Sequence, residues 1–260
     1  MNKNDIVRVK ITDIGTDGEG IGKADGFTLF VNNTAPGDVI DARILKAKKT
    51  YAYAKVEKLI EAAESRVDPA CPVADKCGGC TIQHLSYESQ LELKSKKVFD
   101  CLTRIGGLDA EELKDKFEPI IGMDDPWNYR NKAQYPIGKD KNGNPTIGFY
   151  AYHSHNIIEN DFCKIQNPCC SFIIKALREV ISKFNILPYD EMEQKGTIRH
   201  CLIRVGAATG EVMVCIVINA AGKELRNWSD TAPQMIELKE RFEKAVSEFN
   251  KSDEKEPGDP

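Results

Sequence analysis

Residues 6–31 read IVRVKITDIGTDGEGIGKADGFTLFV, a stretch in which short apolar runs alternate with closely spaced glycines. In its first run, Val7, Val9 and Ile11 share one face of an extended chain, and polar side chains occupy the other face. This two-residue period is typical of a half-buried β-strand. Similar runs and turn signals continue to residue 59 and predict about five strands. Because so short a sheet avoids exposed edges by closing, we expect a small OB-like β-barrel over residues 1–60.

The glycines of DGEGIG, residues 17–22, also raise the possibility of a phosphate-binding loop. They stand at alternate positions and not in the GxGxxG order, and no amphipathic helix follows them as a nucleotide-binding fingerprint requires. We therefore interpret them as turns and bends of the barrel.

The composition excludes several classes of protein. The longest apolar run, residues 212–218, has the length of a strand and falls far short of the roughly 20 residues that a membrane helix needs. The polar N-terminus lacks the apolar segment of a secretory signal. Nine cysteines cannot all pair within one chain, which makes a disulfide framework unlikely. These features predict a protein of the reducing cytoplasm without a membrane partner.

The net charge of −4 does not argue against a nucleic-acid partner, because the charge is unevenly distributed. Residues 1–60 carry ten Lys and Arg against eight Asp and Glu, a balance of +2. Residues 224–260 carry six against ten, a balance of −4. A phosphate backbone responds to the local potential, so a basic face on the N-terminal barrel remains compatible with the acidic chain.

The rest of the chain predicts a polar connector followed by an α+β domain. We expect the connector at 61–70, the central domain at 71–225, an amphipathic helix at 226–250 that leads to a further domain, and a disordered tail at 251–260. Within the central domain, the patterns predict two helices, over 87–105 and about 168–185. They also predict two strands, over 197–205 and 211–219. Asn142 and Gly143 predict a hairpin turn.

A group of cysteines is the strongest chemical signal in the chain. CPVADKCGGC, residues 71–80, places Cys71, Cys77 and Cys80 close together, and the two glycines let the backbone fold tightly between the last two. Three such thiolates can converge on one metal centre, and the spacing leaves zinc and an iron–sulfur cluster both open. The candidates for the fourth ligand are His84, Cys101, Cys163, Cys169 and Cys170.

The other cysteines fit core packing better than chemistry. Cys101 lies near the apolar face of a predicted helix, and Cys201 and Cys215 lie in predicted strands, so we expect each to be a small buried hydrophobe. Similarly, we interpret His200, beside an arginine in a predicted strand, as a hydrogen-bonding residue, and we assign no catalytic role to His153 or His155.

KAKKTYAYAK, residues 46–55, is the first candidate RNA contact. Lys46, Lys48 and Lys49 precede Tyr51 and Tyr53, which share one face of the predicted strand. Attraction of phosphates combined with base stacking is the usual mode of barrels that bind single strands. The alternative interpretation is a solvated edge strand guarded by lysines.

WNYRNK, residues 127–132, is the second candidate. Arg130 and Lys132 share one face of this segment if it is extended, where they could contact RNA.

Four segments resemble, in this order, the bacterial uracil-C5 RNA methyltransferases of the 23S ribosomal RNA type: CPVADKCGGCTIQHL at 71–85, WNYRNKAQYPIG at 127–138, GFYAYHSHNIIENDFCKIQ at 148–166 and GTIRHCLIRVGAATGEVMV at 196–214. The first sixty residues are similar to the TRAM domain of that family, an OB-like RNA-binding barrel. The resemblance implies a TRAM barrel followed by an α+β domain that carries a [4Fe-4S] cluster, with RNA, 23S ribosomal RNA in particular, as the partner.

The resemblance also implies the ligands of this cluster. They are Cys71, Cys77, Cys80 and, from the CKIQ segment, Cys163. Methyl transfer needs no redox turnover, so we expect a cluster that is structural or that orients the RNA.

In that family the nucleophilic thiolate, the base and the site for S-adenosylmethionine belong to a C-terminal Rossmann-like domain. We identify neither a glycine-rich cofactor loop nor a nucleophile motif in the sequence. We therefore expect the chain to stop before its catalytic domain, to lack S-adenosylmethionine and to be inactive alone. The alternative is a free-standing RNA-binding module that holds an iron–sulfur cluster or zinc without catalysis.

Overall fold

The computed structural model describes residues 1–221, 225 and 228–253. The chain divides into two compact units, one made of Met1–Asp75 and Cys80–Pro126 and the other of Lys76–Gly79 and Trp127–Pro260. Among the described residues, no helix combines the length and the apolar character that crossing a membrane requires.

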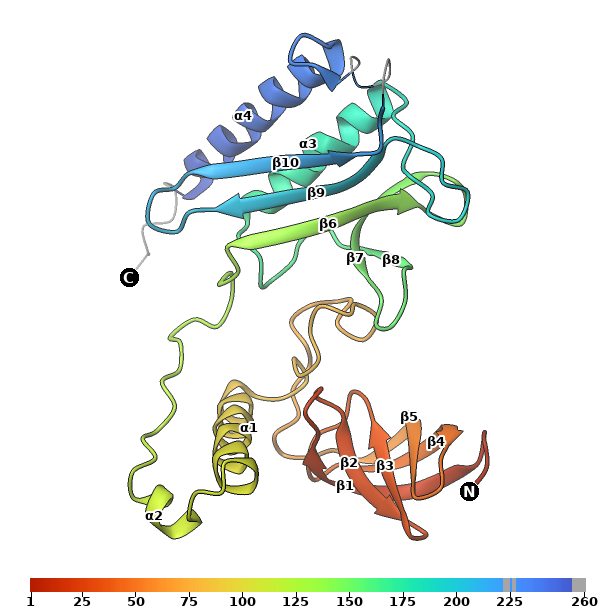
Figure 1. Cartoon of the computed structure of the whole chain (residues 1–260), viewed down its shortest axis with the longest axis vertical. Helices are drawn as coiled ribbons and strands as arrows, with labels where there is room; N and C mark the ends of the chain where they lie inside the picture. Colours follow the sequence, from red (N-terminus) through yellow and green to blue (C-terminus); the bar gives the residue numbers. More distant parts are fainter. Residues whose placement is uncertain (222–224, 226–227, 254–260) are drawn as a thin grey trace. The chain divides into compact units, whose positions relative to one another are not determined.

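The first unit contains the predicted barrel. Its strands are β1 (Ile6–Ile14), β2 (Gly20–Ala24), β3 (Phe27–Val31), β4 (Val39–Ala47) and β5 (Tyr51–Glu61), and they close in the order β1-β2-β3-β5-β4 (Figure 1). Neighbouring strands are antiparallel except β3 and β5, which run parallel. The alternate positions that point inward form an aliphatic core of Val9, Ile11, Leu29, Val31, Ile40, Ala42, Ile44, Ala52 and Ala54. The alternation in the sequence therefore predicted the barrel correctly.

The glycines of β2 allow close approach inside the barrel. A Cβ added at Gly22 would lie 2.5 Å from Cγ2 of Val9, and one added at Gly20 would lie 1.9 Å from Oγ1 of Thr34. Any larger residue would push these elements apart, which confirms that these glycines serve barrel packing.

Asp38 fastens the chain after the barrel to the barrel itself. Its fully buried carboxylate accepts hydrogen bonds from the backbone N–H groups of Ala35, at 2.7 Å, and Ala63, at 2.9 Å. The Arg66 guanidinium adds two more, one of them from Nε at 3.1 Å, and also donates to the carbonyl of Asn33 at 2.9 Å. The connector expected at 61–70 therefore lies inside the first unit, because these bonds hold it against the barrel.

The first unit continues with α1 (Tyr87–Asp100), the π-helical turn η1 (Cys101–Ile105) and α2 (Ala110–Lys114). The helix predicted over 87–105 is thus present as two consecutive pieces. The expectation that Cys101 is buried is wrong, because no residue of α1 or η1 is buried and Cys101 is exposed. Polar contacts link α1 to the end of β1 and to the loop after it: Lys96 pairs with Asp13 of β1, and Lys97 donates to the carbonyl of Thr16 in the loop.

The second unit is a sheet with two helices. Its strands are β6 (Lys132–Lys139), β7 (Pro145–Tyr150), β8 (Ile157–Glu159), β9 (Ile198–Val205) and β10 (Val212–Ile218), in the antiparallel order β10-β9-β6-β7-β8. The helices α3 (Cys169–Lys183) and α4 (Pro233–Asp253) lie together along the sheet (Figure 1). The predicted turn at Asn142 and Gly143 joins β6 to β7, with Gly143 at φ +84°.

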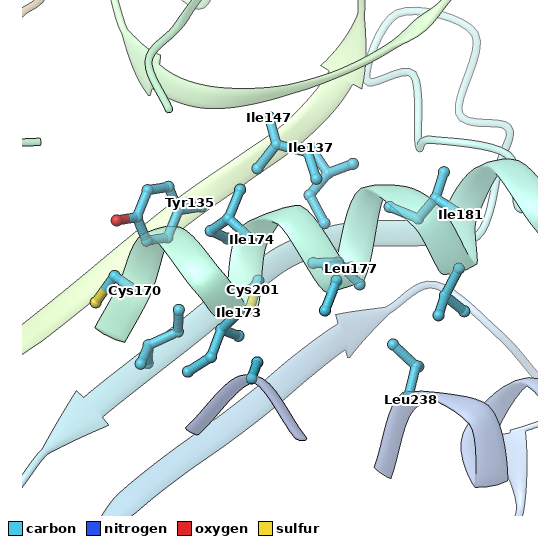
Figure 2. Close-up of a cluster of buried hydrophobic side chains, with 14 of the residues drawn as sticks. Tyr135, Ile137, Ile147, Cys170, Ile173, Ile174, Leu177, Ile181, Cys201 and Leu238 are labelled. Atoms are coloured by element: carbon cyan, nitrogen blue, oxygen red, sulfur yellow. The ribbon is translucent and has the colours of Figure 1, made fainter. Parts of the chain in front are cut away.

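Figure 2 shows the core of this unit, where side chains of α3 meet those of the sheet and of α4. Leu238 and Ala245 of α4 are buried in it. The helix expected at 226–250 as a lead to a further domain is therefore part of the core of this unit. Lys251–Asp253, the start of the tail expected to be disordered, complete α4, and residues 254–260 lie outside the described residues.

The cysteines of the second core have raised thiol pKa values. Burial raises the pKa of Cys169 to about 11 and of Cys170 to about 12, and it also raises that of Cys201. These thiols remain protonated, and the expectation of a buried Cys201 is confirmed. The same expectation for Cys215 is wrong: Val214 and Ile216 pack against the core, so the alternation of β10 turns Cys215 to the opposite, exposed face.

We predict that Asp38→Asn destabilises the first unit by about 3 kcal/mol at pH 7, because it leaves the Arg66 cation without its buried counterion. Burial alone would raise the pKa of Asp38, but the hydrogen bonds from Arg66, Ala35 and Ala63 outweigh it and hold the pKa below 3.8. The unfolded chain therefore takes up the proton first, so this stabilisation is complete above about pH 4 and is lost as the pH falls through the folded-state pKa.

Urea unfolding followed by circular dichroism measures this difference. Asp41→Asn is the matched control, because Asp41 pairs with Arg8 on the surface and should contribute little. Equal stability of the two variants, or a difference from wild type that grows below pH 4, would contradict the assigned role of Asp38.

Candidate nucleic-acid interface

Three aromatic rings form one cluster on the outer face of the barrel. Tyr51 and Tyr53 come from β5, and Phe30 comes from the neighbouring strand β3 in register with Tyr53. The ring centroids lie 5.7 Å apart for the two tyrosines, and 5.9 and 5.8 Å from Phe30 to Tyr51 and Tyr53. The side chains between them in sequence fill the barrel, so strand alternation places these three rings outside. Tyr53 is 46% exposed.

The predicted lysines lie beside this cluster. Lys46 is in register with Tyr53 across β4 and β5, and the backbone N–H of Lys48 donates to the carbonyl of Tyr51 at 2.8 Å. This turn presents Lys48 and Lys49 to solvent. The six residues Phe30, Tyr51, Tyr53, Lys46, Lys48 and Lys49 are called the aromatic–lysine surface below.

The positive charge of this surface is available to a ligand. Within residues 1–221, 225 and 228–253, the side chains of Lys46, Lys48 and Lys49 make no ion pair or hydrogen bond. By contrast, Arg43 on the same strand as Lys46 is bound by the carboxylate of Glu57, with Nη2 and Oε1 2.7 Å apart.

The alternative of a lysine-guarded edge strand does not describe the tyrosines. Tyr53 is paired with β3 on one side and with β4 on the other, and Tyr51 pairs with β3 and accepts a backbone hydrogen bond from Lys48, so neither tyrosine stands at a sheet edge. The structure also adds Phe30, which the sequence analysis missed. The alternation of FTLFV, with Leu29 and Val31 inward, was the signal that could have placed it outside.

Arg130 and Lys132 belong to the second unit, where both are exposed. The backbone N–H of Arg130 donates to the carbonyl of Ile165 at 2.9 Å, which joins this segment to the strand-like residues after Cys163. Lys132 begins β6 in register with Arg204 of β9, a further exposed cation that the sequence analysis did not single out.

Gln83 organises the part of the cysteine motif that lies in the first unit. Its Oε1 accepts a hydrogen bond from the backbone N–H of Cys71 at 3.2 Å, and its Nε2 donates to Sγ of Cys80 at 3.3 Å. His84 is engaged elsewhere, because its buried Nε2 lies 3.0 Å from the carbonyl oxygen of Thr34. Burial lowers the pKa of His84, so its ring is neutral.

The part of the motif that belongs to the second unit pairs with the strand end after β7. Cys77 forms a β-bridge with Ala151, and the backbone N–H of Gly78 donates to the carbonyl of Tyr150 at 2.9 Å. The backbone N–H of Gly79 lies 3.4 Å from Sγ of Cys77 and donates to it. Donors directed at sulfur favour the thiolate over the thiol.

Cys163 lies in the turn after β8, where its carbonyl accepts from the backbone N–H of Gln166 at 3.1 Å. In the part of the chain that the structure describes, no three His, Cys, Asp or Glu side chains form a group that could hold a metal ion. The four-cysteine ligand set stays a prediction.

Comparison with known proteins gives this arrangement a context. Residues 2–56 match the TRAM domain family. The chain is 46% identical over 217 residues to an uncharacterised RNA methyltransferase of Clostridium tetani, covering 84% of this chain and 46% of the relative. It is 42% identical over 246 residues to one of Halalkalibacterium halodurans, covering 95% and 51%.

A solved structure is also similar: the Pyrococcus abyssi tRNA (uracil-54, C5)-methyltransferase in complex with S-adenosyl-L-homocysteine. It matches with a TM-score of 0.60 and 28% identity, over 85% of this chain and 49% of that one. The chain thus spans about half the length of the proteins it matches. The expectation that it stops before a catalytic domain gains no support from these matches. Residues 2–56 thus match the TRAM domain family, and the chain is similar to RNA methyltransferases over most of its length.

Proposed function

We propose that the chain recognises RNA for the S-adenosylmethionine-dependent methylation of a uracil at C5, with 23S ribosomal RNA as the substrate. The observation that carries the proposal is the aromatic–lysine surface on the TRAM barrel. It offers three adjoining rings for base stacking, and its three lysines have no partner among the described residues. Rings with flanking cations are the arrangement by which barrels bind single-stranded nucleic acid.

The proposed reaction rests on two independent supports. The four ordered sequence segments resemble uracil-C5 methyltransferases of ribosomal RNA, and the Pyrococcus abyssi structure is named for C5 methylation of a uracil in tRNA. Both supports point to methylation of uracil at C5, but one concerns ribosomal RNA and the other transfer RNA. Transfer RNA is therefore the second candidate substrate. S-adenosylmethionine would supply the methyl group, and the proposal places none of its ligands among the described residues.

We further propose Cys71, Cys77, Cys80 and Cys163 as ligands of a [4Fe-4S] cluster. The donor set fits, since four thiolates are the usual ligands of such a cluster. Gln83 and the backbone of Gly79 direct hydrogen bonds at two of the sulfurs, as expected for sulfurs that carry negative charge.

The structure also weighs against three of the other four candidates for the fourth ligand. Cys169 and Cys170 are buried in the core with raised thiol pKa values, and the ring of His84 is held by Thr34. Cys163 lies in the turn after β8 and is only partly buried. When bound, the cluster would fix the polypeptide around its ligands without taking part in methyl transfer.

We predict that replacing Lys46, Lys48 and Lys49 together by alanine weakens binding to a single-stranded ribosomal RNA fragment and flattens its dependence on salt. Each lost phosphate contact should reduce the log–log slope by about 0.7, or roughly 2 for all three. Fluorescence anisotropy at several salt concentrations measures both quantities.

The matched control replaces Lys10, Lys114 and Lys116, three exposed lysines of the same unit, and removes the same charge. If both triple variants lose affinity equally, net charge and not the aromatic–lysine surface binds the RNA. Repeating the titration with a tRNA transcript decides between the two substrates, and the true substrate should bind more tightly.

Tyr53→Ala should weaken binding of the same RNA about tenfold, because base stacking on an aromatic ring contributes about 1–3 kcal/mol to the binding free energy. Tyr53→Phe keeps the ring and should bind like the wild type. Equal affinity of the alanine and phenylalanine variants would show that the ring does not stack on a base.

For the cluster, we predict that protein purified without oxygen is brown and contains roughly four irons per chain. Cys163→Ala should lose most of the iron, whereas Cys101→Ala and Cys215→Ala, which remove exposed thiols, should keep it. A colourless protein with one zinc, or full iron content in Cys163→Ala, would refute the proposed ligand set.

A further inference from the structure

A basin with a volume of about 820 Å³ opens beside the β6–β7 turn of the second unit. The end of β6, the loop between β7 and β8, the segment that precedes β9 and the start of β9 line it. The side chains that matter for its chemistry are Lys139, Lys141, Tyr150, His155, Tyr189 and Arg199. None of them belongs to the aromatic–lysine surface or to the cysteine motif.

Two stacked pairs form part of the lining. The rings of Tyr150 and His155 stack with centroids 5.3 Å apart and an interplanar angle of 29°. The guanidinium of Arg199 lies 4.5 Å from the centre of the Tyr189 ring. Glu191 joins the two pairs, with one carboxylate oxygen 3.1 Å from Nδ1 of His155 and the other 3.3 Å from Nη2 of Arg199. The basin thus presents planar groups whose orientation is already fixed.

The His155 side chain is 81% exposed, although it stacks on Tyr150. Its ring is therefore accessible to a planar ligand, and stacking on it would extend the existing pair by one layer. His200, half-buried in the same lining, has its pKa lowered by burial and by the Arg199 cation. A neutral imidazole can donate and accept one hydrogen bond each, as the edge of an uncharged base requires.

The charged side chains of the lining differ in the partners they have. Asp140 accepts from the backbone N–H groups of Asn142 and Asn144, both at 2.8 Å. Asp190 accepts from the backbone N–H groups of Met192 and Glu193, and Glu191 contacts His155 and Arg199. The Lys139 and Lys141 side chains make no ion pair or hydrogen bond with any described residue. The two ammonium groups would therefore be available for hydrogen bonds to a phosphate, in a lining whose three cations and three carboxylates balance in formal charge.

We propose that this basin binds one unpaired nucleotide of the RNA, with its base stacked on His155 and its phosphate held by Lys139 and Lys141. Stacking combined with a phosphate contact is the chemistry by which proteins hold splayed single-stranded nucleotides. The proposal rests on the RNA-binding function proposed above and adds a second contact, carried by the other unit of the chain.

The test uses the full chain and a fluorescein-labelled twelve-nucleotide single-stranded oligouridine in an anisotropy titration. His155→Ala should bind about tenfold more weakly, because it removes a stacking ring. His155→Phe keeps the ring but not the nitrogen that faces Glu191, and it should stay within about twofold of the wild type. All three side chains to be changed are exposed, so the fold should persist.

Lys139→Ala combined with Lys141→Ala should reduce the slope of affinity against salt by up to about 1.4, the value expected for two phosphate contacts with a single strand. The matched control changes Lys175 and Lys239, two exposed lysines on the helices of the same unit. This control should keep the wild-type slope.

A second readout is local to the basin. The same oligonucleotide with 4-thiouridine is cross-linked by light, and the modified peptides are identified by mass spectrometry. Cross-links within residues 150–157 or 189–200 are expected, and they should disappear in His155→Ala.

The outcomes separate the two proposals. If the basin variants bind like the wild type while the Lys46, Lys48 and Lys49 variant does not, the basin proposal is overturned and the RNA-binding function stands. If His155→Phe fails as badly as His155→Ala, the contact with Glu191 matters and base stacking is refuted. If the wild type binds no RNA, both proposals fall together.

Discussion

The two-residue period of the β-strand is the constraint on which both units depend. When β3 and β5 enter a closed barrel, every second side chain must fill the interior, and the remaining ones must face solvent. Leu29 and Ala52 fill the interior, so Phe30, Tyr51 and Tyr53 become neighbours outside. The packing and register of the barrel strands thus place the three rings together on the outer face. The lysines at the β4–β5 turn lie beside them.

The same physics separates two kinds of cysteine. Burial removes Cys170 and Cys201 from water, which raises their thiol pKa values and makes them small apolar core residues (Figure 2). Cys77 and Cys80 instead receive hydrogen bonds from N–H groups, an environment that favours a negatively charged sulfur. The local surroundings of each sulfur, and not cysteine density along the chain, therefore distinguish packing from ligand chemistry.

Local patterns predicted the barrel strands, the hairpin at Gly143 and the three longer helices α1, α3 and α4, because period and turn chemistry are properties of neighbouring residues. Local patterns cannot predict contacts between residues that are far apart in the sequence. Nothing near Asp38 in the sequence indicates that Arg66 returns to bind it, and so the connector appeared free. Cys215 was misplaced because a continuous apolar run does not reveal which of its two faces is buried. Phe30 was not predicted, although the alternation of FTLFV places it on the face opposite Leu29 and Val31.

The central claim is that the aromatic–lysine surface binds RNA. Mapping backbone amide shifts of the ¹⁵N-labelled chain during titration with a single-stranded ribosomal RNA fragment tests it most directly, since every amide of the barrel reports separately. The account predicts that the largest shifts on the barrel cluster at residues 28–31 and 46–54. Shifts confined to the opposite part of the barrel, around the Arg8–Asp41 ion pair, would contradict it.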